Sequence, residues 1–159
     1  MNTRTDCRGF TAVEALTVLA IIAVLAAIAV PSLANILAGQ RLRAAGTDLM
    51  SSLLLARSEA IKRNAQVAVS PRTAGDWKSG WRVAVVTTDE QVDRKEALGL
   101  RVDVPVAPAD VVYQRNGRLG IAGVVRIEFR DQENRVGVES RCVTIHPSGL
   151  PRLKRGACA

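Results

Sequence analysis

The amino-acid sequence predicts an α+β protein in which a long N-terminal helix packs on a small antiparallel β-sheet. Three observations support this fold class. An uninterrupted apolar run lies near the N-terminus. An apolar stripe at helical spacing continues beyond that run, and the remaining sequence alternates apolar and polar residues in short segments, as half-buried strands do. One helical part followed by several strands favours α+β over alternating α/β units.

The apolar run covers residues 10–30, where only Thr11, Glu14 and Thr17 are polar. At about 1.5 Å per residue the run reaches roughly 30 Å, enough to cross the hydrocarbon core of a bilayer. Arg4 and Arg8 precede it. The positive-inside rule therefore predicts that the short leader stays in the cytoplasm and that the rest of the chain is exported.

A cleaved secretory signal is the alternative interpretation of this run. The small residues Ala27-Ile28-Ala29 would then form the cleavage site, and the mature chain would begin at Val30. The acid Glu14 inside the apolar run favours a retained segment instead. An ionised side chain in a membrane span is costly, so it usually has a partner and a function.

The helix is predicted to continue past the apolar run, from about residue 11 to residue 63, which makes it roughly 80 Å long. An apolar stripe follows spacings of three and four residues in its second half. The stripe consists of Leu42, Ala45, Leu49, Leu53, Ala56 and Ala60. Glu59 lies three and four residues before Lys62 and Arg63, which predicts ion pairs at the helix end. The stripe requires an apolar partner.

Short alternating segments predict strands that supply this partner. They begin at Val67, at Trp81, at Val111, at Val125 and at Cys142. In the fourth segment Val125, Ile127 and Phe129 face one way, and Arg126, Glu128 and Arg130 face the other. Residues 88–110 are predicted as a loop with an edge strand near 98–104. Turns are predicted at Asn116-Gly117, at 132–134 and at 147–149.

Composition narrows the possible functions. The formal net charge is +7, and aromatic residues make up only 3%. So few aromatic side chains disfavour a stacking platform for single-stranded nucleic acid. The basic charge fits polyanionic partners such as DNA or phospholipid headgroups, and it fits solubility alone equally well.

Export would place the cysteines of the mature chain in an oxidising compartment. Cys7 lies in the leader, which leaves Cys142 and Cys158 in the exported part. These two are predicted to pair, and closing this loop contributes about 3 kcal/mol in the chain-entropy model. The single histidine, His146, and the lack of a CxxC pair disfavour a metal site. No nucleophile–base pair or phosphate loop is visible, so we predict no catalytic residues, no enzyme activity and no cofactor.

Several motifs resemble those of one known family. The junction Arg8-Gly9-Phe10, followed by Glu14, resembles the type III signal of type IV pilins and pseudopilins. The helix end at residues 56–64 and the Trp77 with Gly80-Trp81 pattern resemble GspH/FimT-type pseudopilins and minor pilins. So does the segment 141–145 with its Ser-Gly turn. On physical grounds alone, the helix end is also explained as a solvated surface and the tryptophans as packing residues.

This resemblance implies a pilin fold and a processing step. Prepilin peptidase is expected to cut between Gly9 and Phe10 and to methylate the new amino group of Phe10. Glu14 then becomes the fifth residue and neutralises the N-terminal ammonium of a neighbouring subunit during assembly. The implied organisation is a leader at 1–9, a membrane and filament-core helix at 10–31, an amphipathic half at 32–64, and a periplasmic sheet domain at 65–159.

The C-terminal part is basic. No acid follows Glu139, and Arg152, Lys154 and Arg155 lie within the predicted disulfide loop. FimT-type minor pilins are thought to bind DNA through a C-terminal Gly-Arg-x-Arg element. Here the element is Gly149-Leu150-Pro151-Arg152, so Leu150 replaces the first arginine. We predict Arg152, Lys154 and Arg155 as DNA-binding residues, with a solvated basic tail as the alternative.

The resemblance therefore implies a minor pilin of a type IV pilus-like machine, with DNA binding for uptake. The alternative function is the H-type pseudopilin of a type II secretion system. Its expected partners are other pilins through the N-terminal helix, prepilin peptidase, the inner membrane and DNA. The expected location is the bacterial inner membrane, single-pass with a periplasmic C-terminal domain, and then the pilus or pseudopilus.

Overall fold

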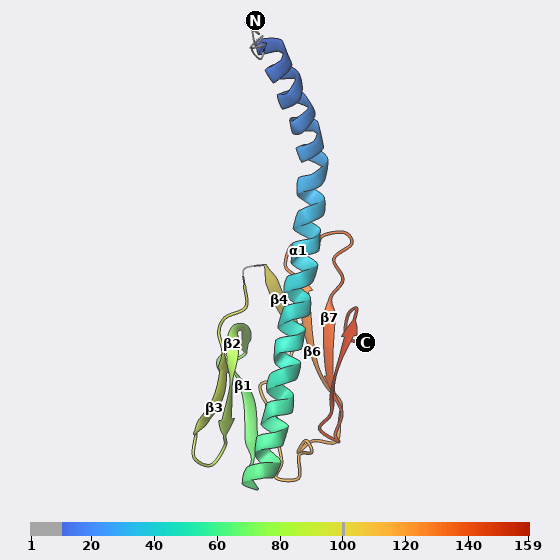
Figure 1. Ribbon diagram of the computed structural model, residues 1–159. Coiled ribbons are helices and arrows are strands. Elements are labelled where there is room, and N and C mark those ends of the chain that lie inside the picture. Colours follow the sequence, from blue (N-terminus) through green and yellow to red (C-terminus); the bar gives the residue numbers. More distant parts are fainter. Residues whose placement is uncertain (1–10, 100) are drawn as a thin grey trace, which may run out of the picture. The chain divides into compact units, whose positions relative to one another are not determined.

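The computed structural model describes residues 11–99 and 101–159. The predictions for Cys7, Gly9 and Phe10 lie outside the described residues. Helix α1 runs from Ala12 to Arg63 without a break, close to the predicted bounds (Figure 1). The chain divides into two units, one ending at Ala34 and one beginning at Asn35. Each unit is described by itself.

The described part of the first unit is helical throughout and exposes its apolar side chains. Val13, Leu16, Leu19 and Ile28 are each more than 60% exposed. An 18-residue window of α1 has a mean hydropathy of 2.7, and none of that window is buried within the chain. By length and composition this stretch is able to cross a membrane. An exposed apolar surface of this extent is typical of segments that contact a membrane or another protein.

The second unit combines the rest of α1 with eight strands (Figure 1). The strands are β1 (Val67–Thr73), β2 (Asp76–Val85), β3 (Gln91–Lys95), β4 (Val102–Val106), β5 (Val111–Tyr113), β6 (Val125–Asp131), β7 (Arg141–Ile145) and β8 (Pro151–Arg155). The α+β architecture predicted from the sequence, a long helix followed by antiparallel strands, is confirmed.

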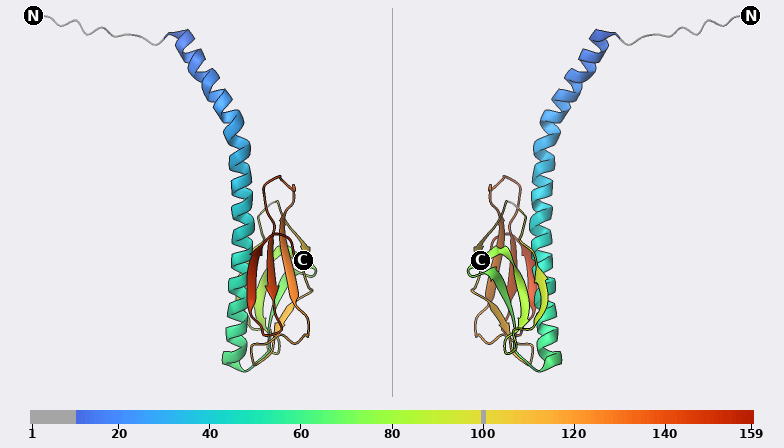
Figure 2. Two further views of the ribbon diagram at one scale, coloured as in Figure 1. Left: turned by 90° about the vertical axis from the view of Figure 1, so that its right-hand side faces the viewer. Right: turned by 90° about the vertical axis from the view of Figure 1, so that its left-hand side faces the viewer.

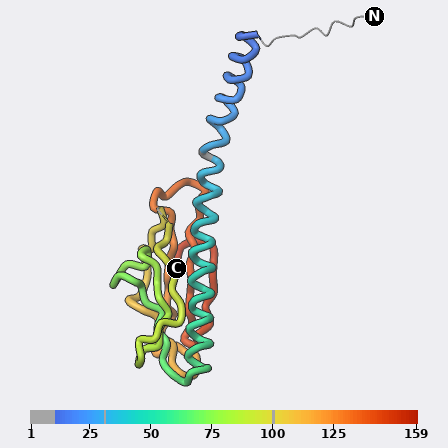
Figure 3. The backbone as a smooth tube through the Cα atoms, turned by 60° about the vertical axis from the view of Figure 1, so that its left-hand side comes forward, coloured from blue at the N-terminus to red at the C-terminus, as the bar shows by residue number. Residues whose placement is uncertain are grey.

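The strands form two antiparallel sheets of four strands each. Sheet A has the order β3-β2-β1-β5, and sheet B has the order β4-β6-β7-β8. Both sheets lie on the same side of residues 35–63 of α1 (Figure 2). The chain passes from α1 into sheet A and returns at its C-terminus beside the same helix (Figure 3). The N-terminal and C-terminal parts of this unit are therefore neighbours.

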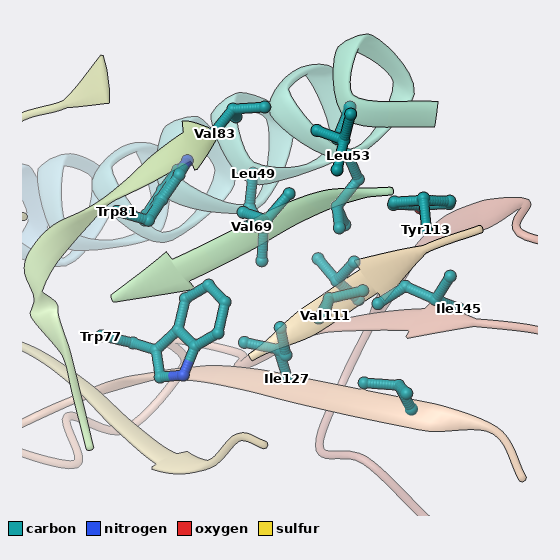
Figure 4. Packing of buried hydrophobic residues seen from close by; sticks show 14 of the residues in the cluster. Leu49, Leu53, Val69, Trp77, Trp81, Val83, Val111, Tyr113, Ile127 and Ile145 are labelled. Carbon is teal, nitrogen blue, oxygen red and sulfur yellow. The ribbon is translucent and has the colours of Figure 1, made fainter. Parts of the chain in front are cut away.

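One hydrophobic core joins the helix to both sheets. All six residues of the predicted helical stripe are buried, and they pack with side chains from both sheets. Figure 4 shows Leu49 and Leu53 of α1 near Val83 and Val69 of sheet A, with Ile127 of sheet B in the same cluster. The stripe therefore has the partner that its spacing required.

Trp77 and Trp81 are core residues, which confirms the packing interpretation. The Trp81 indole N–H donates to the Ser52 hydroxyl of α1 at 3.0 Å, and the Trp77 indole N–H donates to the Pro108 carbonyl at 2.7 Å. Gly80 between them has a φ of +89°. A Cβ atom there would collide with the backbone of residues 95 and 96, so only glycine fits this position.

Three predictions about the strands need correction. Residues 88–110 are not one loop, because they contain β3 and β4. The expected edge strand near 98–104 is β4, which begins at Val102. Strand β3 was not predicted because it is an edge strand rich in charged residues. None of its residues is fully buried, so its sequence shows no apolar alternation. The basic tail is likewise not a loop, because it forms strand β8.

Candidate functional site

The first turn of α1 holds Glu14 in a capping box. The Glu14 backbone N–H donates to the Thr11 hydroxyl at 3.2 Å. In return, the Thr11 N–H donates to the Glu14 carboxylate oxygen Oε2 at 3.4 Å. This reciprocal pair satisfies two backbone N–H groups that the helix start leaves free. Thr-x-x-Glu before an apolar run is the sequence signature of a capping box, and it was not predicted above.

The capping box leaves Glu14 available for a further partner. Its carboxylate is exposed, and within residues 11–99 and 101–159 only Thr11 hydrogen-bonds to it. The hydroxyl of Thr17, the other polar group in this stretch, donates to the Val13 carbonyl at 2.8 Å. Glu14 is therefore the one described acid in an exposed apolar stretch, and it can accept a cation from another molecule.

The helix end at residues 56–64 has a structural role within the second unit. The Arg57 guanidinium donates to the Gly117 carbonyl at 3.0 Å, which holds the predicted Asn116-Gly117 turn. Glu59 pairs with Lys62 and with Arg63, as the spacing predicted. The hydrogen bond from Arg63 lowers the pKa of the Glu59 carboxyl. Asn64 has a φ of +49°, the left-handed conformation that commonly ends a helix. This motif therefore closes α1 onto the sheets.

The C-terminal hairpin carries the predicted disulfide. Strand β7 pairs with β8 in a register that places Cys142 opposite Lys154 and Thr144 opposite Arg152. Cys142 is bonded to Cys158, with their Cα atoms 5.2 Å apart. The bond fastens the chain end to β7, beyond the last residue of β8.

A buried carboxylate supports the same chain end. Glu128 faces away from α1, as predicted, yet it is only 6% exposed. Its carboxylate accepts a hydrogen bond from the Cys158 backbone N–H at 3.0 Å. Alternation alone predicted an exposed acid, because it could not foresee that the C-terminal residues fold over this side of sheet B.

Strand alternation divides the predicted DNA-binding residues between two faces. Arg141, Val143, Leu153 and Arg155 point toward α1, where the Leu153 side chain packs beside Gly46. Arg152 and Lys154 point to the opposite, outer face of sheet B, together with Arg126 and Thr144. Lys154 and Arg155 nevertheless line two cavities together, and Arg152 lines neither of them. His146, just after β7, is exposed on one of these cavities, of about 250 Å³, with Arg126, Lys154 and Arg155.

The sequence matches the family described as "Type II transport protein GspH" over residues 45–149. The chain belongs to this family. The match covers α1 from residue 45 to its end, sheet A, strands β4, β6 and β7 of sheet B and the turn that follows β7, and it ends before strand β8. The chain is therefore a minor pilin or pseudopilin, a member of a family of structural filament subunits.

Three solved structures share this fold. The minor pilin FimU of the Pseudomonas aeruginosa type IV pilus matches with a TM-score of 0.63 at 17% identity, covering 72% of this chain and 89% of that chain. A second crystal form of FimU matches with a TM-score of 0.57. The minor pseudopilin EpsH of the Vibrio cholerae type 2 secretion system matches with a TM-score of 0.55 at 15% identity, covering 72% and 97%. No curated protein sequence matches.

Proposed function

We propose that this chain is a minor pilin of a type IV pilus-like machine. It is held in the inner membrane by residues 10–31, with residues 65–159 in the periplasm, until it enters the filament. The observation that carries the proposal is the first part of α1, which exposes a continuous apolar surface of bilayer length. Lipid covers this surface before assembly, and the helices of sister subunits cover it afterwards.

Processing precedes assembly in this proposal. Prepilin peptidase removes residues 1–9 and methylates the new amino group of Phe10. Mass spectrometry of the N-terminal peptide from the membrane-bound protein tests this step. A methylated peptide that starts at Phe10 is expected, whereas a mature chain that starts at Val30 would contradict both the step and the retained anchor.

Glu14 then neutralises the N-terminal ammonium of a neighbouring subunit. Each of these charges is costly by itself in an apolar environment, and together they form an ion pair whose geometry fixes the register between subunits. The capping box is compatible with this role, since Thr11 bonds only one of the two carboxylate oxygens in the described residues.

Two substitutions distinguish the ion-pairing role of Glu14 from its role in the helix cap. Glu14→Gln keeps a side chain suitable for a capping box but removes the charge, and Thr11→Ala removes the cap but keeps the charge. We expect Glu14→Gln to lower the amount of this subunit in sheared filaments on the order of tenfold or more, as the loss of a buried ion pair predicts. Thr11→Ala should be close to wild type. Quantitative immunoblots of filaments and of whole cells provide the measurement.

The opposite pattern would overturn the assembly role. If Thr11→Ala abolishes incorporation and Glu14→Gln does not, Glu14 serves the helix start alone. Normal peptidase processing of both variants is the control, because it shows that each protein reaches the membrane with its anchor in place.

We propose DNA as a second partner, which binds the outer face of sheet B. Arg126, Arg152 and Lys154 share the outer face of sheet B, whereas Arg155 belongs by alternation to the other face. Three cations on one rigid sheet can contact successive phosphates at little ordering cost.

Retardation of duplex DNA by the full chain in detergent tests this surface. The double substitution Arg152→Gln with Lys154→Gln should weaken binding and reduce its salt dependence by about one unit of log–log slope per lost phosphate contact. Arg118→Gln is the control, because Arg118 is also an exposed arginine but lies outside sheet B, in the turn after β5. Equal retardation by all variants would contradict a role for this surface.

The alternative function is the H-type pseudopilin of a type II secretion system, which the description of the matching family favours. A deletion strain of the native host distinguishes the two. Loss of surface pili with normal protein secretion supports the minor pilin, and retention of secreted proteins inside the cell with normal pili supports the pseudopilin.

A further inference from the structure

Strand β8 forms one open edge of sheet B. It pairs only with β7, since the strand order ends there. The hydrogen bonds from Gly156 N–H to the Ser140 carbonyl and from His146 N–H to the Leu150 carbonyl fix which residue pairs are bonded across the hairpin. Bonded and non-bonded pairs alternate in an antiparallel ladder. Arg152 and Lys154 are therefore bonded to β7, and Leu153 and Arg155 are not.

The backbone groups of Leu153 and Arg155 consequently point away from β7. In the described part of the chain, no hydrogen bond reaches the N–H groups of these two residues, and none reaches the carbonyls of Pro151, Leu153 or Arg155. The edge thus offers two donors and three acceptors in the spacing of a strand. A row of this kind is a template for a further strand.

A groove runs beside this edge, between β8 and the packed half of α1. A cavity of about 180 Å³ is lined by Arg43, Arg141, Leu153, Lys154 and Arg155. A second cavity of about 300 Å³ extends along α1 toward Asn35 and shares Arg43, Arg141 and Arg155 with the first. Figure 2 shows β8 next to α1, so both walls of the groove belong to rigid elements.

The groove is strongly basic. Three arginines line both cavities, one from α1, one from β7 and one from β8, and no acidic residue lines either cavity. Among the described residues, the one acid within ion-pair distance of these three arginines is Glu139, whose exposed carboxylate lies 3.6 Å from the Arg141 guanidinium. A segment lying in the groove therefore gains most from carboxylates that face these guanidinium groups.

We propose that this groove binds an extended acidic segment of a partner protein, which adds to β8 as a fifth strand of sheet B. Main-chain hydrogen bonds to Leu153 and Arg155 hold the segment, and its carboxylates pair with Arg43, Arg141 and Arg155. The edge favours a peptide over DNA because it presents carbonyl acceptors as well as donors, and a phosphate backbone has no N–H groups to satisfy them. The basic side chains also discourage pairing between two copies of β8.

The test uses the full chain in detergent micelles and an eight-residue peptide of alternating glutamate and valine. A peptide of alternating lysine and valine is the charge control. Amide hydrogen exchange gives the sharpest readout. In the free protein the Arg152 and Lys154 amides should exchange slowly and the Leu153 and Arg155 amides rapidly. With the acidic peptide bound, the Leu153 and Arg155 amides should slow on the order of tenfold or more, as new strand bonds require.

Three variants separate the charge and backbone contributions. Arg43→Gln and Arg155→Gln should each weaken acidic-peptide binding on the order of tenfold, since each removes a carboxylate partner. Arg152→Gln lies on the same strand but on the opposite face, so it should leave binding nearly unchanged. Leu153→Pro removes an edge N–H that β7 does not use, and it should abolish binding while the Arg152 and Lys154 amides stay protected.

Each remaining outcome overturns the proposal. It fails if the acidic peptide does not bind, if it binds without slowing the Leu153 and Arg155 amides, or if the lysine peptide binds equally well. It also fails if duplex DNA, and not the peptide, protects these amides. Loss of DNA binding through Arg152 leaves the result unaffected, because that side chain lies on the other face and lines neither cavity of the groove.

Discussion

The two parts of α1 have the same backbone structure but present their apolar side chains to different surroundings. Residues 12–34 expose theirs, with Leu19 at 61%. Residues 35–63 bury a single stripe in which Leu49, Leu53, Ala56 and Ala60 are fully buried. Hydrogen bonds within the backbone are satisfied in both parts, so the difference lies entirely in what covers the side chains.

This difference shows that the described residues of one chain supply the packing partners of the second part of α1 but not those of the first part. Burying one leucine, isoleucine or valine side chain contributes about 1.5–3 kcal/mol. The second part of α1 obtains this free energy from the two sheets. In the first part, no residue of the apolar window is buried by the described residues of the chain. Lipid or neighbouring subunits supply that cover in the function proposed above.

Leu53→Ala tests the packed part and should have the largest effect. Leu53 is fully buried in the core that joins the helix to both sheets. Removing three carbon atoms there leaves a cavity, and we expect the free energy of unfolding to fall by about 2–5 kcal/mol. Denaturant unfolding followed by tryptophan fluorescence is the measurement, because Trp77 and Trp81 are the only tryptophans and both lie in this unit.

The neighbouring residue supplies the matched control. Leu54 is 41% exposed. Leu54→Ala should therefore lower the free energy of unfolding by less than about 1 kcal/mol. Equal losses for the two variants would show that the apolar stripe is not what holds the helix to the sheets.

Much of this comparison could be predicted from the sequence. The apolar run and the helical stripe each extend over more than fifteen residues. Sequence patterns of this length can be recognised without knowledge of tertiary contacts. The pairing of Cys142 with Cys158 followed from cysteine number and compartment. The strands with a buried face, such as β6 and β7, also showed their alternation directly.

The features that escaped prediction depend on tertiary contacts. Strand β3 has no buried face, and β8 has a proline start and three exposed cations, so neither shows clear alternation. The burial of Glu128 depends on a chain end thirty residues later in the sequence. The placement of Arg152 and Lys154 on one face and Arg155 on the other follows only from the formation of strand β8, which was not predicted. The capping box of Thr11 and Glu14, by contrast, has a recognisable sequence signature, but it was not predicted.

Removing the disulfide should have the second largest effect within the packed unit. The bond closes a loop with a sequence separation of 16 residues. Replacing both Cys142 and Cys158 with alanine should lower the free energy of unfolding by about 3 kcal/mol in the chain-entropy model. Wild-type protein treated with a reductant is the control, and it should lose a similar amount. A loss below about 0.5 kcal/mol would show that the pairing of β8 with β7 and the hydrogen bond to Glu128 hold the C-terminal residues without the disulfide.

A polar atom in the core predicts a smaller, pH-dependent effect. The Tyr113 side chain is fully buried, and its hydroxyl has no hydrogen-bond partner among the described residues. Burial raises the pKa of the Tyr113 phenol well above its ordinary value of 10.0, although Arg57 opposes the shift. The unfolded chain releases this proton near pH 10 and the folded chain retains it. The contribution to stability is therefore complete below pH 10 and falls as the pH rises further.

Tyr113→Phe removes both the unpaired hydroxyl and the titration. We expect it to raise the free energy of unfolding at neutral pH by about 1 kcal/mol and to flatten the loss of stability above pH 10. Tyr113 is the only tyrosine, so the ultraviolet absorbance of phenolate reports its titration directly. Ionisation at the ordinary value in the folded chain would show that water reaches the hydroxyl.

Leu19→Ala, the same substitution as Leu53→Ala but in the exposed part of α1, should have the smallest effect. Because Leu19 is exposed and alanine has a slightly higher helix propensity, the free energy of unfolding should change by less than about 0.5 kcal/mol in detergent micelles. The two leucines share one helix and differ only in what covers them, so their difference measures the packing contribution of the sheets. A loss as large as that of Leu53→Ala would show that the chain covers Leu19 itself. The first part of α1 would then need neither lipid nor a neighbouring subunit.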